Sequence, residues 1–532
     1  MKNKIYCFIT AAIPIMWGVI TACIMLLLWV FHPLIEYPLK YTFGLSNLSL
    51  TFISVITVFA FFLLYLWKKQ RIDGFFKKLK SKAVIVATTV LFILQLIIFY
   101  NIFFKTDWDV EQILYAAEAM SKNIFEPGAQ DWYYMRYPNN LLMTWIFSVI
   151  IRVSNLLGFS GEFQHIYAII IVQCIIACVT AYLLFSTVRM IVKNPVAPYL
   201  AWAIYVFHVA LNPTLTIPYS DSLSLIFPIA IFRIYLSTKN DACLPLKWCG
   251  IAVLSYLGYK IKPQVIIIFI AIVIYEVAVF LLDSDKRKKI CKAIGYGVGA
   301  AVLCITVLVS NFAFSRLPVR LNDDCVFGFS HFLMMGLNDE TGGTYSTEDV
   351  VFSAQFATSE ERAEANFRVA KERLKEFGFS GFVKFMTKKA LINFGNGTYS
   401  WGVEGVFYYV VPEEKNDSLS PFLRSLYYNH GENYRHFATF QQYMWITVLI
   451  GNIGILFALR DKKLRAAVAV SVLALIGLAM FEMLFEARMR YLFNYSPLFI
   501  LSATVGWYAM LRSIAPFVEK IKTKFIKKEV SE

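Results

Sequence analysis

The sequence predicts an all-α polytopic membrane protein with about twelve transmembrane helices and a large external loop domain. Of its 532 residues, 58% are hydrophobic and only 16% are charged, and its mean hydropathy is +0.58. Soluble domains have roughly 45–50% apolar and about 25% charged residues. The apolar residues also form long blocks, many close to the ~20 residues with which a helix crosses a bilayer. These observations exclude a soluble enzyme.

The basic residues predict the orientation of the chain in the membrane. They concentrate in short stretches between apolar blocks, at 68–82, 286–292, 462–465 and 520–528. Lysine and arginine in short loops mark the cytoplasmic side of a membrane. We therefore expect a multi-pass protein of the plasma membrane, typical of bacteria, with both termini cytoplasmic. The net charge of +15 then reflects topology and does not indicate a nucleic-acid partner.

A path that keeps every basic cluster inside gives twelve predicted crossings. These are 5–31, 50–67, 83–104, 166–188, 199–217, 223–236, 248–259, 265–282, 294–314, 443–458, 466–481 and 491–511. The apolar segment 141–157 is short and contains Arg152 and Asn155, so it is predicted to be a juxtamembrane or re-entrant helix.

Four parts of the chain follow from this path. Residues 1–82 hold two extra N-terminal spans and a basic loop, and residues 83–314 form a core membrane module. The acidic first external loop of that module is 105–140. Residues 315–441 form the external loop domain, and 442–532 hold three spans and a basic tail.

The external domain is predicted to contain two amphipathic helices. Thr358 and Glu361 have capping-box spacing, and Gly378 suits a helix end. The following stretch, 381–394, sets aromatic and aliphatic residues against three lysines, Lys384, Lys388 and Lys389. Such a helix is expected to lie in the head-group layer, with its lysines on the polar side.

Ionisable residues gather at the external ends of the predicted spans. They are Asp107, Asp109, Glu111, Asp221, Lys260, Lys262, Glu486, Arg488 and Arg490. Ionisable groups are rare inside membrane segments, so a cluster on one side of a membrane indicates a functional site.

Four short motifs among these residues resemble the GT-C glycosyltransferases, the class that contains protein O-mannosyltransferases and lipid A aminoarabinose transferase. They are Thr106-Asp107-Trp108-Asp109-Val110-Glu111, Arg136-Tyr137-Pro138-Asn139-Asn140, Pro218-Tyr219-Ser220-Asp221 and Phe485-Glu486-Ala487-Arg488-Met489-Arg490-Tyr491. The resemblance covers roughly 83–511. Two departures are that the adjacent acid pair of the family appears here as Asp-Trp-Asp-Val-Glu, and that two spans precede the core.

The resemblance implies an inverting transfer of a hexose-like sugar from a polyprenyl-phosphate-linked donor. The acceptor would be a hydroxyl of a glycan or lipid-linked molecule on the outer face, in a cell-surface glycan or wall polymer. No particular cofactor is indicated, and a divalent metal ion is left open. Membrane lipids are the other expected partners.

The site residues implied by this reading have three roles. Asp109, with Asp107, would act as the general base, and Asp221 and Glu111 would support it. The donor phosphate would be held by cations, which suit a developing phosphate charge, namely Lys260, Lys262, Arg488, Arg490 and Arg136. Aromatic walls for the sugar would come from Trp108, Trp132 and Tyr133, with Tyr134 and Trp401 as further candidates.

Structural roles are open for the same residues. Asp109 has Gln112 three residues later and could cap a helix, as could Asp221. Lysines at span ends could extend to the interface, and the aromatic residues could form an interfacial belt.

Two other functions remain open. A lipid-linked glycan polymerase or ligase would also have a large external loop, but it would depend on loop arginines instead of a first-loop acid. A transporter or flippase would favour internal repeats and charges near the midplane of the membrane, and neither is evident in the sequence.

Overall fold

Helices form nearly all of the regular structure in this computed structural model. It describes residues 2–31, 43–79, 81–126, 131–237, 244–403, 407–413 and 418–529. Across those ranges, β structure is limited to an isolated antiparallel bridge between Lys105 and Val410. The predicted all-α class is confirmed.

Ten helical segments of the described chain are long and apolar enough to cross a membrane. They are α1 (Lys2–Val30), α2 (Asn47–Trp67), α4 (Ser81–Ile102), α8 (Glu162–Ile191), α10 with α11 (Ser220–Ser237), η6 with α13 (Pro263–Leu282), α14 (Lys286–Phe314), α19 with η8 (Tyr434–Arg460), α20 (Lys462–Leu484) and η9 with α21 (Met489–Lys520). Each coincides with a predicted span.

The other two predicted spans are helices with features of their own. The span 199–217 is α9 (Ala197–Tyr205) continued by a π-helical turn, η3 (Val206–Ala210), and then η4 (Pro213–Thr216). The span 248–259 lies within α12 (Leu244–Ile261), which packs along α14 and α11. Neither is among the ten.

Aspartate caps begin two of the membrane helices beside basic clusters. The Asp285 carboxylate accepts hydrogen bonds from the backbone N–H groups of Arg287 and Lys288, at 3.0 and 3.3 Å. The Asp461 carboxylate accepts from Lys463 and Leu464 in the same way. These bonds satisfy backbone donors that a helix start leaves without partners.

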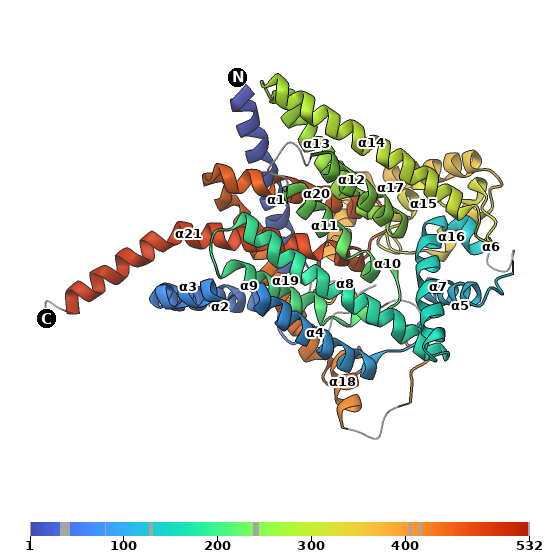
Figure 1. Ribbon diagram of the computed structural model, residues 1–532, viewed down its shortest axis with the longest axis horizontal. Coiled ribbons are helices and arrows are strands. Elements are labelled where there is room, and N and C mark those ends of the chain that lie inside the picture. Colours follow the sequence, from blue (N-terminus) through green and yellow to red (C-terminus); the bar gives the residue numbers. More distant parts are fainter. Residues whose placement is uncertain are drawn as a thin grey trace.

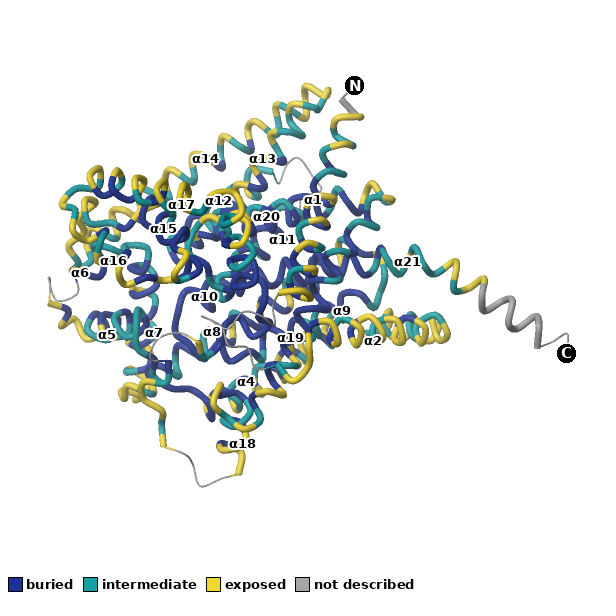
Figure 2. The backbone as a smooth tube through the Cα atoms, turned by 180° about the vertical axis from the view of Figure 1, so that it is seen from behind, coloured by how far each residue is buried: buried dark blue, intermediate teal, exposed yellow. Residues whose placement is uncertain are grey.

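The bundle has a buried centre and apolar outer helices. Helices α19, α20 and α21 are largely buried, whereas α2 and α14 expose apolar side chains such as Phe52, Ile56 and Leu308 along their length. Figure 2 shows these two helices at the periphery with much of their surface exposed. Exposed apolar helices of membrane length are suited to contact lipid.

Glycines bring two central helices into backbone contact. A Cβ at Gly451 would lie 2.7 Å from the Ala503 carbonyl oxygen, and one at Gly454 would lie 2.9 Å from the Gly506 carbonyl. A Cβ at Gly506 would clash with the Gly451 carbonyl in turn. Small residues permit this close approach of membrane helices, so α19 with η8 and α21 form the tight centre of the bundle.

The connecting helices gather at one end of the bundle, which we call the loop end. They are α5 (Asp109–Ser121), α6 (Asp131–Arg136), η2 (Pro138–Asn140), α7 (Leu141–Leu156), η7 (Asp323–Cys325), α15 (Phe329–Gly336), α16 (Thr347–Ala354) and α17 (Ser359–Phe394). In Figure 1 these helices lie on the right, whereas basic α3 (Lys69–Lys78) and the end of α21 lie on the left. A further short helix, α18 (Leu419–Tyr427), packs against α4 and α19.

Helix α17 confirms part of the amphipathic pattern and corrects another part. The Thr358 hydroxyl accepts from Glu361 N–H at 3.3 Å, and the predicted stop at Gly378 is a kink with φ of 54°. Beyond the kink, Phe379 is exposed, but Lys389 is fully buried. The expectation that Lys389 lies on a polar helix face is wrong, because this turn packs beneath α15 and against the end of α20.

Candidate functional site

The chain that follows α4 is held in a strained loop. Trp108 has a φ of 56°, an uncommon conformation for a bulky residue that costs on the order of 1–3 kcal/mol. Its backbone N–H donates to Asp107 Oδ1 at 2.6 Å, and its indole N–H donates to Thr106 Oγ1 at 2.9 Å. The backbone of Lys105, just before the loop, pairs with Val410. These contacts fix where α5 begins.

Asp109 is the first residue of α5 and accepts a hydrogen bond from a distant tyrosine. The N-cap position belongs to Trp108, so the alternative in which Asp109 caps the helix is wrong. The Tyr219 hydroxyl donates to Asp109 Oδ2 at 2.8 Å. Burial and the nearby Asp109 charge raise the pKa of Tyr219 well above its usual value, which keeps this donor protonated. The positive end of the α5 dipole also favours a carboxylate here.

Asp221 lies two residues after Tyr219 and holds two cations. It is 3% exposed and pairs with Lys262 Nζ and with Arg490 Nη1, the latter at 3.3 Å. These residues come from α10 (Ser220–Leu223), from the residue before η6 (Pro263–Val265), and from η9 (Met489–Tyr495). Tyr219 occupies the N-cap of α10, so a capping role for Asp221 is also wrong. Burial lowers the pKa of Lys262, and the Asp221 charge opposes this shift.

Aromatic rings connect the cation cluster to Asp109. The Arg490 guanidinium lies 5.0, 5.2 and 5.1 Å from the ring centroids of Trp108, Tyr219 and Tyr491. Trp108 and Tyr219 contact each other edge to face at 5.0 Å. Cation–π contacts within about 6 Å are attractive. They tie the strained loop, the Tyr219 segment and η9 into one site.

A small cavity opens where these segments meet. Its free volume of about 30 Å³ accommodates one or two water molecules. The lining includes Trp108, Thr214, Ile217, Tyr219, Asp221, Ser222, Tyr399, Ser400, Trp401, Phe407 and Arg490. Tyr399 and Ser400 both have positive φ, 59° and 57°. The cavity therefore brings together strained backbone, aromatic walls, a carboxylate and an arginine.

Of the predicted phosphate-binding cations, Lys262 and Arg490 pair with Asp221, and the other three have further contacts. Lys260 Nζ lies 5.7 Å from the ring centroids of both Tyr256 and Phe314. Arg488 Nε pairs with Glu486 at 3.5 Å, and Arg136 lies 5.6 Å from the Phe327 ring.

The remaining predicted site residues occupy different positions around Asp109. Asp107 is held by the N–H of its own neighbour, and Glu111 pairs with Lys105 at 3.3 Å. Trp132 is 51% exposed and contacts Tyr133. Tyr133 is buried and accepts from Asn140 at 2.7 Å. Burial, followed by the charge of Asp109, raises the pKa of Tyr133.

Sequence reasoning missed a second buried polar group next to this cluster. Gln264 donates to Glu482 Oε1 at 2.6 Å, and Lys389 donates to the Gly336 carbonyl at 2.5 Å. Asn393 donates to the Glu482 carbonyl at 2.8 Å. Burial lowers the pKa of Lys389 to about 7, against the charges of Glu482 and Glu486. The available signal was Glu482 itself, a carboxylate near the end of an apolar run.

Among the described residues, no group of three or more His, Cys, Asp or Glu side chains is arranged to hold a metal ion.

The fold and site define an integral membrane protein with a buried cluster of acids and cations at the loop end of its helix bundle. The chain belongs to a family described as conserved hypothetical integral membrane proteins, whose model matches residues 5–511. A comparison with curated proteins found no significant match.

Among solved structures, the chain is similar to the crystal structure of ArnT from Cupriavidus metallidurans in the apo state. The two share 12% sequence identity, with 82% of this chain and 79% of that chain covered and a TM-score of 0.31.

Proposed function

We propose that the protein is a membrane glycosyltransferase of GT-C type, which moves a sugar from a polyprenyl-phosphate-linked donor to an acceptor hydroxyl. One observation carries the proposal. Tyr219 contacts Asp109, and the same short segment supplies Asp221, which holds Lys262 and Arg490. Tyr219, which contacts Asp109, and Arg490, one of the two cations, line the same aromatic cavity. Sugar transfer to a hydroxyl requires a proton acceptor and a cationic site for the leaving phosphate.

Asp109 is proposed as the general base. In a single displacement, the acceptor oxygen bonds to the anomeric carbon as the bond from that carbon to the phosphate oxygen breaks. The hydroxyl proton passes to Asp109, and the lipid phosphate leaves with the electron pair. Inversion at the anomeric carbon follows. General bases of this kind contribute about 10²–10⁴-fold to a rate.

Lys262 and Arg490 are proposed to receive the leaving phosphate. Its charge grows in the transition state, where preorganised cations stabilise it most. Asp221 orients both cations but also competes for them. We expect the phosphate to take over part of the contact with Arg490, because that pair is longer, at 3.3 Å, and the guanidinium has further donors in its planar fork.

Trp108, Tyr399 and Trp401 are proposed as the aromatic walls of the sugar site. The free volume of about 30 Å³ is too small for a sugar, so the cavity must widen when the donor binds. The two adjacent positive-φ residues, Tyr399 and Ser400, make that segment the candidate for the movement.

Polyprenyl phosphate, the common product of such donors, tests the proposal without knowledge of the sugar. We expect the purified protein in nanodiscs to bind it, and Lys262→Met to weaken binding about tenfold or more through loss of a charge-assisted contact. Lys384→Met, an exposed lysine on α17, is the matched control. Equal binding by all three proteins would contradict the assigned phosphate site.

Release of polyprenyl phosphate from a panel of polyprenyl-phosphate hexoses, with cell glycan as acceptor, tests the transfer itself. Substrate movement across the membrane without release would instead support a flippase. Release that survives loss of Asp109 would support a polymerase or ligase.

The proposed location of the reaction is the outer face of a plasma membrane, with both termini cytoplasmic. Ser284 lies beside a basic cluster and Glu348 lies at the loop end, and both are exposed. In a cysteine-free background in intact cells, an impermeant thiol reagent should label Glu348→Cys and spare Ser284→Cys. The reverse pattern would place the site on the cytoplasmic face.

A further inference from the structure

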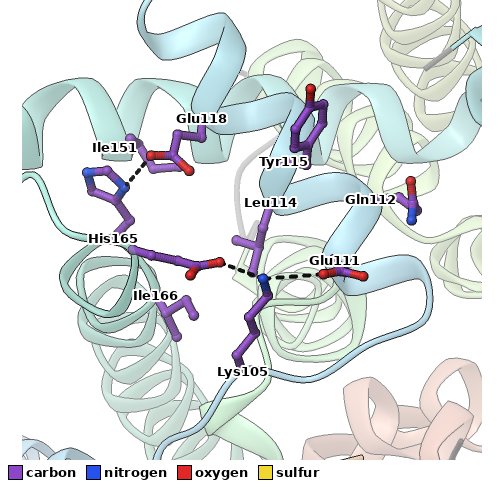
Figure 3. Close-up of a pocket in the computed structure, with 10 residues that line it drawn as sticks. Lys105, Glu111, Gln112, Leu114, Tyr115, Glu118, Ile151, His165 and Ile166 are labelled. Carbon is purple, nitrogen blue, oxygen red and sulfur yellow. Dashed lines mark ion pairs between the residues drawn. The ribbon is translucent and has the colours of Figure 1, made fainter. Parts of the chain in front are cut away.

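We propose that a second pocket at the loop end binds the primary-ammonium head group of a membrane lipid. The α5–α8 pocket is defined by Lys105, Glu111, Glu118, Glu162 and His165, above an apolar floor that includes Ile166 (Figure 3). Its free volume is about 200 Å³, which suits a small head group. It is a different cavity from the one beside Asp109, and its ligand does not depend on the transfer reaction.

The charges in this pocket favour a cation. Three carboxylates line the pocket, from Glu111, Glu118 and Glu162, and Lys105 supplies the one ammonium group in the lining. Lys105 pairs with Glu162 at 2.7 Å and with Glu111 at 3.3 Å. Glu118 pairs with Lys122 at 2.9 Å, outside the pocket lining. Counting both lysines, three acids still exceed two bases. A phosphate would meet net negative charge here, whereas an ammonium would be attracted.

His165 provides independent evidence for a missing donor. It is 2% exposed, and its Nε2 lies 2.7 Å from Asn155 Oδ1. An amide oxygen only accepts, so in a neutral ring Nε2 carries the proton and Nδ1 is an acceptor. That Nδ1 has no hydrogen-bond partner among the described residues and faces Glu118 Oε1 at 3.5 Å (Figure 3).

Glu118 Oε1 already accepts from Lys122 at 2.9 Å, so His165 Nδ1 is the buried acceptor here that lacks a donor in the described part of the chain. A buried polar atom without a partner costs about 1–3 kcal/mol. A primary ammonium has three N–H groups and can donate to Glu118, to His165 Nδ1 and to a further carboxylate of the pocket. A quaternary ammonium has no N–H and cannot meet this need.

Aromatic residues place the pocket at the depth of lipid head groups. Tyr100 near the end of α4 and Phe103 just after it pack against Phe163 and Tyr167 at the start of α8, with centroids 5.0–5.9 Å apart. Tyr100 is 46% exposed, and exposed tyrosines at span ends are typical of the membrane interface. Lys105 follows the end of α4, and Glu162 and His165 lie at the start of α8. The pocket is therefore at the same depth as these aromatic residues, so a lipid is the expected source of the ammonium.

Lipid retention tests the assignment. The full-length protein would be reconstituted in equimolar phosphatidylethanolamine and phosphatidylcholine and washed with detergent, and the retained lipids counted by mass spectrometry. We expect phosphatidylethanolamine to be enriched roughly tenfold by wild type, since one charge-assisted hydrogen bond contributes about that factor or more. Glu118→Gln should abolish the enrichment, and Glu364→Gln, an exposed residue of α17, should preserve it.

A series of lipids tests the proposal on wild type alone, which removes any dependence on the folding of variants. Retention should fall stepwise as the head-group nitrogen is mono-, di- and trimethylated, because each methyl removes a donor. Equal retention across the series, or unchanged enrichment in Glu118→Gln, would overturn the proposal. Soluble ethanolamine that displaces phosphatidylethanolamine at equal concentration would show that the pocket recognises a free amine and would overturn the assignment to a lipid.

Discussion

The hydroxyl of Tyr219 donates a hydrogen bond to Asp109 Oδ2 at 2.8 Å. This contact joins the start of α5 to the segment before α10, over a separation of 110 residues. Since Asp221 lies on the same short segment as Tyr219, a shift of that segment would move the carboxylate partner and the cation cluster together. The contact therefore couples the proposed proton acceptor to the proposed phosphate site.

Replacement of Tyr219 by Phe tests this coupling. The variant keeps the ring beside Trp108 and Arg490 but loses the donor to Asp109. A hydrogen bond to a charged group contributes about 1.5–3 kcal/mol, so release of polyprenyl phosphate should slow by roughly 10–100-fold. Tyr199→Phe is the matched control, because its hydroxyl donates to the Leu79 carbonyl, far from the loop end. Similar rates for both variants would show that Tyr219 does not orient the base.

Arg490 and Arg488 provide a comparison within one segment. Arg490 contacts Asp221 and three rings, whereas Arg488 pairs with Glu486. At limiting donor, Arg490→Gln should lower the rate on the order of 100-fold, as expected for loss of a transition-state contact. Arg488→Gln should have the smaller effect, because the Glu486 carboxylate pairs with the charge of Arg488. The opposite order would move the phosphate site toward Glu486.

The buried Lys389 predicts a pH dependence of stability. Its pKa is about 7 in the folded protein and about 10.4 in an unfolded chain. Between these values the unfolded state binds more protons, so stability rises with pH, by up to roughly 1.4 kcal/mol per unit. Below pH 7 both states are protonated and this dependence disappears.

Thermal unfolding in detergent at pH 6 to 9.5 measures the effect. Wild type should gain stability relative to Lys389→Met as the pH rises above about 7, with no change in the difference below it. The exposed control Lys384→Met should follow wild type throughout. Parallel pH profiles for wild type and Lys389→Met would mean that Lys389 stays protonated when buried.

Much of the fold could be predicted from the sequence because membrane spans depend on local composition. Long apolar blocks and the capping signal at Thr358 are properties of consecutive residues, and both appear where expected. The burial of Lys389 could not be predicted in this way. Its surroundings come from α15 and α20, which are distant in sequence, and the local pattern placed it on a polar face.

The candidate site shows the same division. The acids and cations at span ends were evident, and the structure brings Asp221, Lys262 and Arg490 together. The sequence did not show which of the cations would pair with Asp221. Lys260 and Lys262 are only two residues apart, and the choice between them depends on where η6 begins, directly after Lys262. Tyr219 was part of a recognised motif, but its role depends on a partner 110 residues away.

The most direct test of the central claim is the rate of sugar transfer by Asp109→Asn. Asparagine keeps the size of the side chain and an oxygen that can accept from Tyr219, so the protein should express and unfold as wild type does. Asparagine cannot take up the proton of the acceptor hydroxyl, and loss of a general base lowers rates by about 10²–10⁴-fold. We predict that Asp109→Asn binds polyprenyl phosphate normally yet transfers sugar at most about one hundredth as fast, while Asp107→Asn is milder. Transfer at a near-normal rate by well-folded Asp109→Asn would contradict the account.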